Sequence, residues 1–171
     1  MMWKWNTRAM FEMSISEELY PVVKIYPNSS LQLIGEGELR KKLEVKINDL
    51  GLRSKIKLLG RRNDVPVILK NSDFFVFPSY YEGLGGALVE AFAAKLPCVC
   101  SSIPVLKEVV GKEDGSLFAA PGDHEKLGDQ IVALYENEKL RTKLSSVSYR
   151  RFHEKFIKSL YFLHENARVS S

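Results

Sequence analysis

Short apolar runs and amphipathic segments alternate along the whole chain. The apolar runs predict strands near residues 31–34, 55–59, 73–77, 97–101 and 116–119. Apolar residues at helical spacing predict helices near 15–26, 36–50, 64–71, 86–95, 103–110, 123–136 and 137–165, the last with a break or bend near 145–148. Because strands and helices alternate, the pattern predicts an α/β fold, a Rossmann-like parallel sheet with helices on both faces.

Some segments carry more specific local signals. In the segment 36–50, leucine and isoleucine recur at helical spacing. Asp123 has the residue type and the place of an N-cap for the helix that follows it. The C-terminal helix, which includes residues 149–165, places aromatic and aliphatic residues between basic ones. Two interpretations of its apolar stripe stay open: the stripe covers the sheet, or it is exposed and binds a partner.

The composition indicates a single globular domain over residues 1–171. The chain has 45% hydrophobic and 27% charged residues, and its apolar runs are shorter than the roughly 20 residues of a membrane-spanning helix. The net charge of +4 fits an anionic ligand or an acidic membrane surface, and no nucleic-acid-binding module is recognisable. Cys98 and Cys100 alternate along one predicted strand, which indicates two buried thiols on one face in a reducing cytoplasm.

The segment from Ser79 to Ala91 holds the most distinctive chemistry. An apolar strand ends at Pro78, a loop with three glycines and Glu82 follows, and Glu90 lies one turn inside the next helix. Glycine lets a backbone approach a ligand closely, and a helix N-terminus directs free N–H groups at that ligand, which is usually phosphate. Two carboxylates beside an anion site would accept hydrogen bonds from hydroxyls, so the pattern predicts a nucleotide-sugar ligand.

This segment resembles the donor-binding motif of the retaining GT-B glycosyltransferases, in which seven residues separate two glutamates. The sequence E-G-L-G-G-A-L-V-E-A at residues 82–91 is similar to the family's E-G-F-G-L-x-x-x-E-A. Further segments match other family motifs in order, at residues 31–37, 56–60, 72–79, 96–101 and 115–123. The resemblance implies transfer of a sugar from a nucleotide diphosphate-sugar with retention at the anomeric carbon, as in polysaccharide biosynthesis.

The resemblance also implies a role for each residue of the motif. Glu82 would be the catalytic residue at the sugar, and whether it acts as a covalent nucleophile stays open. Glu90 would accept hydrogen bonds from the ribose hydroxyls. The residues expected to hold the diphosphate and the sugar are Gly83, Leu84, Gly85, Gly86 and Ala87. Those expected to meet the nucleobase or the phosphates are Gly60, Arg61 and Arg62.

Two features depart from the family pattern. The family begins this domain with a strand carrying G-R-x-x-x-x-K, and residues 1–13 show neither that glycine nor that strand pattern. Lys4 and Arg8 lie near the expected positions, so residues 1–21 are interpreted as a divergent or truncated segment. The family's N-terminal acceptor-binding domain is expected to be absent from this chain, which would leave the isolated chain inactive.

The ligands and the setting follow from the same resemblance. No cofactor and no metal ion are expected, and the donor would be a UDP-sugar. The partners would be this donor and an acceptor-binding domain, with no nucleic acid. A lipid-linked acceptor would bring a cytoplasmic chain to the inner face of the membrane. Three alternatives stay open: a non-catalytic nucleotide-sugar-binding or scaffold chain, a doubly wound signalling domain, and a glycosidase with two carboxylates.

Overall fold

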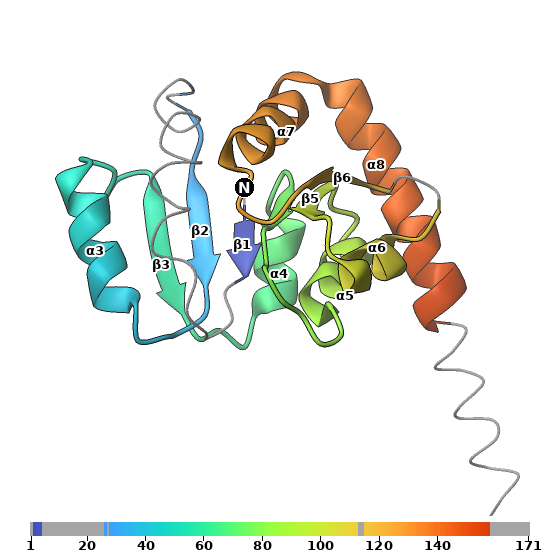
Figure 1. The fold of residues 1–171 in the computed structure, drawn as a ribbon, viewed down its shortest axis with the longest axis horizontal. Coiled ribbons are helices and arrows are strands. Elements are labelled where there is room, and N and C mark those ends of the chain that lie inside the picture. Colours follow the sequence, from blue (N-terminus) through green and yellow to red (C-terminus); the bar gives the residue numbers. More distant parts are fainter. Residues whose placement is uncertain (1, 5–25, 27, 113–114, 158–171) are drawn as a thin grey trace, which may run out of the picture.

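Parallel strands form the centre of the molecule. In this computed structural model, which describes residues 2–4, 26, 28–112 and 115–157, six strands form one sheet in the order β3-β2-β1-β4-β5-β6 (Figure 1). The strands are β1 (Met2–Lys4), β2 (Leu31–Ile34), β3 (Ile56–Gly60), β4 (Phe75–Phe77), β5 (Cys98–Ser101) and β6 (Ser116–Ala119). Each neighbouring pair is parallel. The strands predicted from apolar runs are all present.

Helices cover both faces of this sheet. They are α3 (Arg40–Asp49), α4 (Val65–Lys70), α5 (Gly86–Ala93), α6 (Pro104–Val110), α7 (His124–Glu136), α8 (Glu138–Arg151) and the π-helix η1 (Phe152–Ile157). One buried cluster joins α3 and α7 to one side of the sheet, and a second joins α4, α5 and α6 to the other side. The predicted Rossmann-like α/β fold is therefore confirmed. The helix predicted at 15–26 lies almost entirely outside the described residues.

Strands β4 and β5 are buried on both faces. Phe75 and Val76 are fully buried, and alternation along β4 places Phe75 in one core cluster and Val76 in the other. In β5, Cys98 and Cys100 lie in the same cluster as Phe75, so the prediction that both thiols face one side is confirmed. Burial raises the pKa of both thiols above the ordinary thiol value.

Strand β1 corrects one expectation from the sequence. Residues 1–13 lack the pattern of a first strand, yet Met2–Lys4 forms a strand inside the sheet. Its backbone pairs in parallel with β2 on one side and with β4 on the other. Backbone hydrogen bonds to two neighbours identify this strand, whereas the side-chain pattern that marks longer strands is missing. Arg8 and the rest of the segment up to residue 21 lie outside the described residues.

Helix α8 is continuous where the sequence predicts a break. It runs as one α-helix through residues 145–148, so the predicted break is wrong, and the helix changes to π geometry only at Phe152. Two serines in this stretch tie the helix to neighbouring loops. Ser145 Oγ donates to a carbonyl of the α5–β5 loop at 2.6 Å, and Ser148 Oγ donates to the carbonyl just before β6 at 2.7 Å. These contacts join the middle of α8 to two loops that are distant in the sequence.

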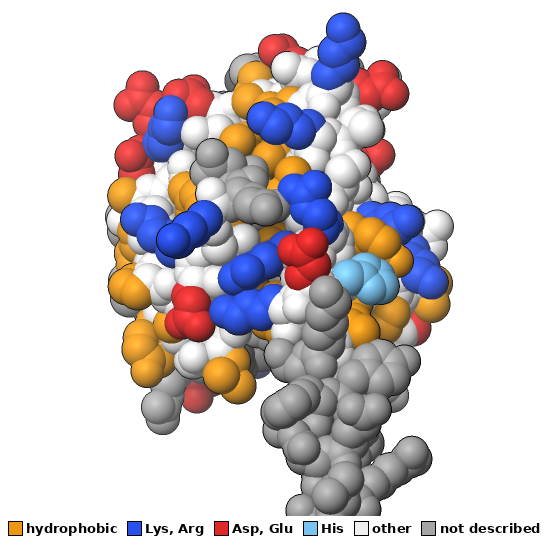
Figure 2. Space-filling view, turned by 90° about the vertical axis from the view of Figure 1, so that its right-hand side faces the viewer, with side chains coloured by type: hydrophobic (Ala, Val, Ile, Leu, Met, Phe, Trp, Pro, Cys, Tyr) orange, Lys and Arg blue, Asp and Glu red, His pale blue; other side chains and the backbone are white. Residues whose placement is uncertain are grey.

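Basic side chains hold the end of α8 and η1 against α6. Arg151 donates to two carbonyl oxygens in the last turn of α6, at 3.0 and 3.1 Å, and Lys155 Nζ lies 3.2 Å from a carboxylate oxygen of Glu108. Figure 2 shows this side of the molecule, where Lys and Arg side chains lie among hydrophobic ones. Phe152 and Phe156 are half-buried against the core cluster of α5 and α6. The described part of the C-terminal helix therefore packs on the core cluster of α5 and α6. Residues 158–165 lie outside the described residues.

Candidate functional site

The loops that follow the strands meet at one edge of the sheet. In a parallel sheet all carboxyl ends lie at the same edge, and ligands bind where the strand order reverses. The chain runs from β1 through β2 to β3 on one side and from β4 through β5 to β6 on the other, so the reversal lies between β1 and β4. Figure 1 shows the arrows of β1, β2 and β3 pointing toward this edge. The β4–α5 loop, residues 78–85, follows the carboxyl end of β4 at this point.

The β4–α5 loop begins in the core and continues into solvent. Ser79 is 8% exposed, whereas Tyr81 and Leu84 are 87% and 86% exposed. Glu82 lies between these two and is half-buried. Its Oε1 accepts a hydrogen bond of 2.8 Å from Ser79 Oγ. The loop therefore presents a carboxylate, held by a buried hydroxyl, at the open edge of the sheet.

The backbone of this loop demands glycine at one position. Gly85 has φ +64° and ψ +28°, a left-handed conformation that strains other residues. A Cβ at Gly85 would also lie 3.0 Å from Leu106 Cδ2 and 3.3 Å from Val109 Cγ2, so the turn packs directly on α6. Among the described residues, nothing lies within 4 Å of a Cβ placed at Gly83 or Gly86. Gly85 thus forms the turn, and the other two glycines leave open space beside the backbone.

Helix α5 brings backbone donors and Glu90 to this edge. The N–H groups of Leu88 and Val89 donate to the carbonyl of the N-cap residue, at 2.9 and 3.3 Å. Those of Gly86 and Ala87 come before them and point out of the helix N-terminus, the positive end of its dipole. Glu90 is exposed and lies four residues after Gly86, and helical side chains lean over the preceding turn. The N–H groups and this carboxylate therefore share one surface.

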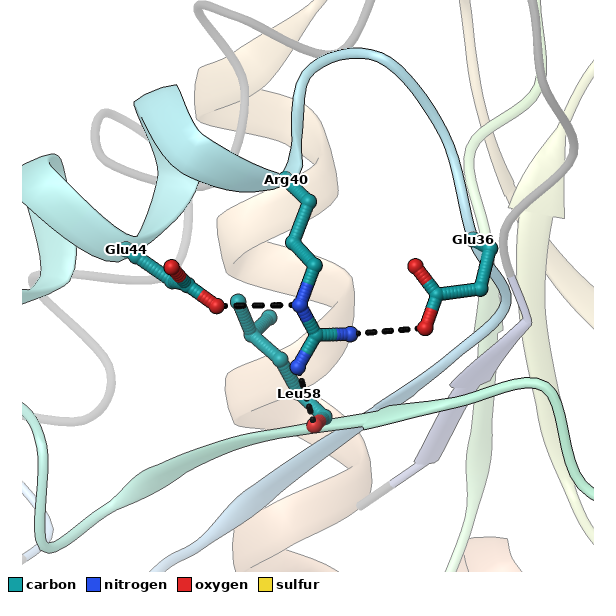
Figure 3. Close-up of polar contacts among 4 residues, drawn as sticks. All are labelled: Glu36, Arg40, Glu44 and Leu58. Atoms are coloured by element: carbon teal, nitrogen blue, oxygen red, sulfur yellow. Dashed lines mark hydrogen bonds and ion pairs between the residues drawn. The ribbon is translucent and has the colours of Figure 1, made fainter.

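The β2–α3 loop and the end of β3 form a second part of the edge (Figure 3). Arg40 donates to carboxylate oxygens of Glu36 and Glu44, both at 2.9 Å, and to the carbonyl of Leu58 at 3.3 Å. Glu36 is thereby held over Gly60, where a Cβ would collide with its carboxylate. The backbone N–H of Gly35 also donates to the Gly60 carbonyl at 2.9 Å, which joins the β2–α3 loop to the end of β3. Gly60 is therefore buried under the β2–α3 loop.

The two arginines after β3 have different surroundings. Arg62 donates twice to the carboxylate of Asp64, at 2.8 and 2.6 Å. These hydrogen bonds lower the pKa of the Asp64 carboxyl and raise the pKa of Arg62. Arg61 is exposed at the surface next to Gly60. Of the two cations expected at this place, Arg62 is already paired with a neighbouring carboxylate, which leaves Arg61 as the better candidate for a ligand phosphate.

Two residues of this edge, Ser79 and Tyr80, receive no role from the sequence. Tyr80 joins the β4–α5 loop to the loop after β6, because a Cβ at Gly122 would lie 3.0 Å from its hydroxyl oxygen. This contact links distant parts of the chain, and no local pattern indicates it. For Ser79 a signal does exist: it is a hydroxyl residue directly after a buried strand and a buried proline, three residues before Glu82.

The described residues also line a cavity of about 370 Å³ at the opposite edge of the sheet. It lies where β2 and β4 begin and α7 ends, among Ser29, Asp73, Tyr135 and Arg141. Arg141 donates there to two carbonyls at the end of α7, at 2.7 and 2.8 Å. Because this cavity lies at the amino ends of the strands, it is separate from the candidate site.

Within residues 26, 28–112 and 115–157, no three His, Cys, Asp or Glu side chains gather into a group that could hold a metal ion. That the reaction needs no metal stays a prediction.

None of the helices in this described part of the chain is long and apolar enough to cross a bilayer.

Comparison with known proteins identifies the family. Residues 17–151 match the family described as "Glycosyl transferases group 1". The chain therefore belongs to this family, and its Rossmann-like fold is that of the GT-B glycosyltransferases among its structural neighbours. The roles of Glu82 and Glu90 and the retention of configuration go beyond this match and stay predictions.

Two curated relatives illustrate the similarity in sequence. The lipopolysaccharide core biosynthesis glycosyltransferase LpsD of Rhizobium meliloti is 33% identical over 147 residues, which cover 84% of this chain and 43% of LpsD. The UDP-Gal:alpha-D-GlcNAc-diphosphoundecaprenol alpha-1,3-galactosyltransferase of Escherichia coli is 44% identical over 80 residues, 46% of this chain and 21% of that enzyme. The chain thus spans less than half the length of either relative.

Solved structures share the fold at low sequence identity. HepE of Anabaena in complex with UDP and glucose has a TM-score of 0.83 at 20% identity, covering 99% of this chain and 48% of HepE. The C-terminal domain of the glycosyl transferase group 1 protein LpcC from Francisella tularensis has a TM-score of 0.78 at 22% identity, covering 91% of this chain and 85% of that domain. At these identities the likeness establishes the fold alone.

Proposed function

We propose that this chain is the donor-binding domain of a retaining glycosyltransferase and binds a nucleotide diphosphate-sugar at the β4–α5 edge. The observation that carries the proposal is the placement of Glu82, the Gly85 turn and the N-terminus of α5 together at the reversal point of a parallel sheet. The seven residues between Glu82 and Glu90 and the membership of the group 1 family support it.

Each group at the edge would contact the part of the donor that suits its chemistry. The N–H groups of Gly86 and Ala87 would hold the diphosphate, because a helix N-terminus stabilises an anion. Glu90 would accept hydrogen bonds from the ribose hydroxyls, and Glu82 would accept one from a sugar hydroxyl. The backbone at the end of β3 would meet the nucleobase, with Arg61 near the phosphates.

Sugar transfer breaks the bond between the anomeric carbon and the diphosphate, and negative charge grows on the departing phosphate. Preorganised N–H groups at the start of α5 would stabilise that charge without reorganisation. No metal ion and no cofactor are proposed for this step. Transfer also needs an acceptor site, which an acceptor-binding domain would supply, and the proposed reaction retains the anomeric configuration.

A UDP-sugar is the proposed donor, and surface-polysaccharide synthesis is the proposed setting. The name of the Escherichia coli relative includes a UDP-galactose donor and a diphosphoundecaprenol-linked acceptor, and the name of LpsD includes lipopolysaccharide core biosynthesis. The HepE complex contains UDP and glucose. A lipid-linked acceptor would bring this chain to the inner, cytoplasmic face of a membrane.

Calorimetric titration of the 171-residue chain with UDP, GDP and ADP tests this proposal. We expect UDP to bind with a Kd between about 1 μM and 1 mM, a free energy of about −8 to −4 kcal/mol. Glu90→Ala removes an ionised acceptor of the ribose hydroxyls and is expected to weaken UDP binding by about tenfold or more. The matched control, Asp129→Ala, removes an exposed carboxylate from α7 and should leave the Kd unchanged.

Weaker binding in Glu90→Ala together with an unchanged Kd in Asp129→Ala would support the donor site. Equal effects of the two substitutions would indicate that the nucleotide binds elsewhere. If the wild-type chain binds none of the three nucleotides, the donor-binding function is contradicted, and the non-catalytic scaffold alternative takes its place.

A further inference from the structure

Ser79 is a buried hydroxyl that is directed at the carboxylate proposed to contact the sugar. The residue is 8% exposed, and its Oγ donates to Glu82 Oε1 at 2.8 Å. It follows β4 and the buried Pro78, so its position is fixed by the edge of the sheet. A hydrogen bond to an ionised acceptor is stronger than a neutral one and has a defined direction. The sheet therefore determines where one oxygen of Glu82 lies.

The chain neighbours of Glu82 give its side chain little support. Tyr81 and Leu84 are 87% and 86% exposed, so neither side chain packs over the carboxylate, and Gly83 has no side chain. A glutamate side chain has several rotatable bonds and keeps many rotamers unless a contact selects one. Among the described residues, the bond from Ser79 is the side-chain contact that selects the arrangement of Glu82.

This bond uses one carboxylate oxygen and leaves the other for a ligand. Oε1 accepts from Ser79, and a carboxylate can accept hydrogen bonds at both of its oxygens. The start of the loop is also supported from outside, because Tyr80 lies against Gly122 in the loop after β6. Glu82 is thus directed by Ser79 while its Oε2 remains outside that bond.

We propose that Ser79 is a positioning residue, which orients the Glu82 carboxylate so that it accepts a hydrogen bond from the sugar of the donor. The inference rests on the proposed function, because it requires a nucleotide-sugar at this edge. Ser79 acts through Glu82 and does not touch the donor. Its removal should therefore weaken the recognition of the sugar and leave the recognition of the nucleotide, which belongs to α5 and the end of β3.

A purely structural role for the same bond predicts a different result. A hydroxyl that bonds a side chain three residues later also closes a loop locally. Loss of loop closure would lower the melting temperature and weaken the binding of UDP and of UDP-sugars by the same factor, because the whole loop would move. The ratio of the two affinities therefore separates positioning from loop closure.

The experiment measures Kd values by calorimetry for UDP and for three UDP-sugars: UDP-glucose, UDP-galactose and UDP-N-acetylglucosamine. The sugar ratio is the Kd of UDP divided by the Kd of the UDP-sugar that binds most tightly. Ser79→Ala should lower this ratio by about two- to tenfold, the value of one hydrogen bond, with an unchanged Kd for UDP. Ser79→Thr keeps the hydroxyl and should keep the ratio.

Two further variants make the test specific. Ser29→Ala removes a hydroxyl that is equally buried, at 9% exposure, and bonds a carbonyl at 2.7 Å near the opposite edge, so it should leave the ratio unchanged. In a Glu82→Ala chain, the further change Ser79→Ala should have no effect on the ratio, because Ser79 acts through the carboxylate.

Each outcome has a defined meaning. A lower ratio in Ser79→Ala that disappears in the Glu82→Ala background supports the positioning role. An unchanged ratio, or equal weakening of UDP and the UDP-sugar, overturns it and leaves the proposed donor site intact. A wild-type ratio of one for all three sugars also overturns it, because Glu82 would not contact the sugar. Absence of UDP binding in the wild type contradicts the donor site itself, and the UDP titration alone reveals this.

Discussion

One added methyl group at Gly85 tests how the proposed donor loop is built. Gly85→Ala places a Cβ in a left-handed turn with φ +64°, 3.0 Å from Leu106 Cδ2 and 3.3 Å from Val109 Cγ2. Gly51→Ala is a matched control, because Gly51 has φ +69° and a Cβ there would meet no atom of the described part of the chain within 4 Å. The two substitutions share the backbone strain and differ in the contact with α6.

The magnitudes follow from these two contributions. An L side chain in the left-handed conformation costs roughly 1–2 kcal/mol at either position. At Gly85, crowding against α6 adds about 1–3 kcal/mol, the range for an extra methylene in a well-packed site. The free energy of unfolding should therefore fall by about 2–5 kcal/mol in Gly85→Ala and by about 1–2 kcal/mol in Gly51→Ala. Alanine restricts the unfolded chain equally in both, so that effect cancels in the difference.

Urea denaturation followed by circular dichroism measures this difference. With an m-value of about 2 kcal/mol/M, a difference of about 1–3 kcal/mol separates the two midpoints by about 0.5–1.5 M. Equal losses of stability in the two variants would refute the reasoning, because they would mean that the turn before α5 does not pack tightly on α6.

Three other predictions concern helix caps, the buried thiols and Arg40. Asp123→Ala and Asn137→Ala each remove an N-cap acceptor of a backbone N–H, at 3.0 and 2.9 Å, and each should lower the free energy of unfolding in urea by about 1 kcal/mol, with the losses adding in the double variant. A change well below this in either variant would show that the side-chain cap contributes little there. Cys98 and Cys100 should not react with a thiol reagent at about pH 8 in the folded chain, because burial raises the pKa of both thiols. Both should react once the chain is unfolded in urea. Rapid reaction in the folded chain would contradict their burial. Arg40→Lys keeps the positive charge but loses the hydrogen bonds that Arg40 makes to three partners. Because the group is partly exposed, the substitution should lower the free energy of unfolding by less than about 1 kcal/mol. A larger loss in urea denaturation would show that these contacts contribute more than a surface ion pair.

The sequence predicts those parts of the fold that depend on local pattern. Strand β4 follows from the continuous apolar run 74–77, since a strand buried on both faces needs apolar residues at every position. Asp123 is confirmed as an N-cap because its carboxylate accepts from a backbone N–H three residues later. The sequence does not indicate strand β1, because its three residues are held by backbone pairing with β2, two of them also with β4, and such pairing needs no side-chain pattern. In the continuous α8, Ser145 and Ser148 bond to loops far away in sequence, and a local pattern does not indicate such contacts.

In the candidate site, too, the sequence indicates some features and leaves others undetermined. Residue types and their spacing along the chain are enough to indicate Glu82 and Glu90. Which of the three glycines is required depends on the left-handed conformation of Gly85 and on the approach of α6 to it, a contact between separate elements. The pairing of Arg62 with Asp64 is a choice of side-chain conformation that spacing alone does not determine. The sequence therefore indicates the chemical groups of the site and not the contacts that direct them.

The most direct test of the donor site is to locate bound nucleotide by backbone amide NMR of the isotope-labelled chain during a titration with UDP. The largest shift changes are expected at Gly60, which ends β3, and at Gly86 and Ala87, which begin α5. Little change is expected at Ser29 and Ser30 beside the cavity of about 370 Å³ at the opposite edge of the sheet. Largest changes around that cavity, or no change at saturating UDP, would contradict a nucleotide-sugar site at the β4–α5 loop.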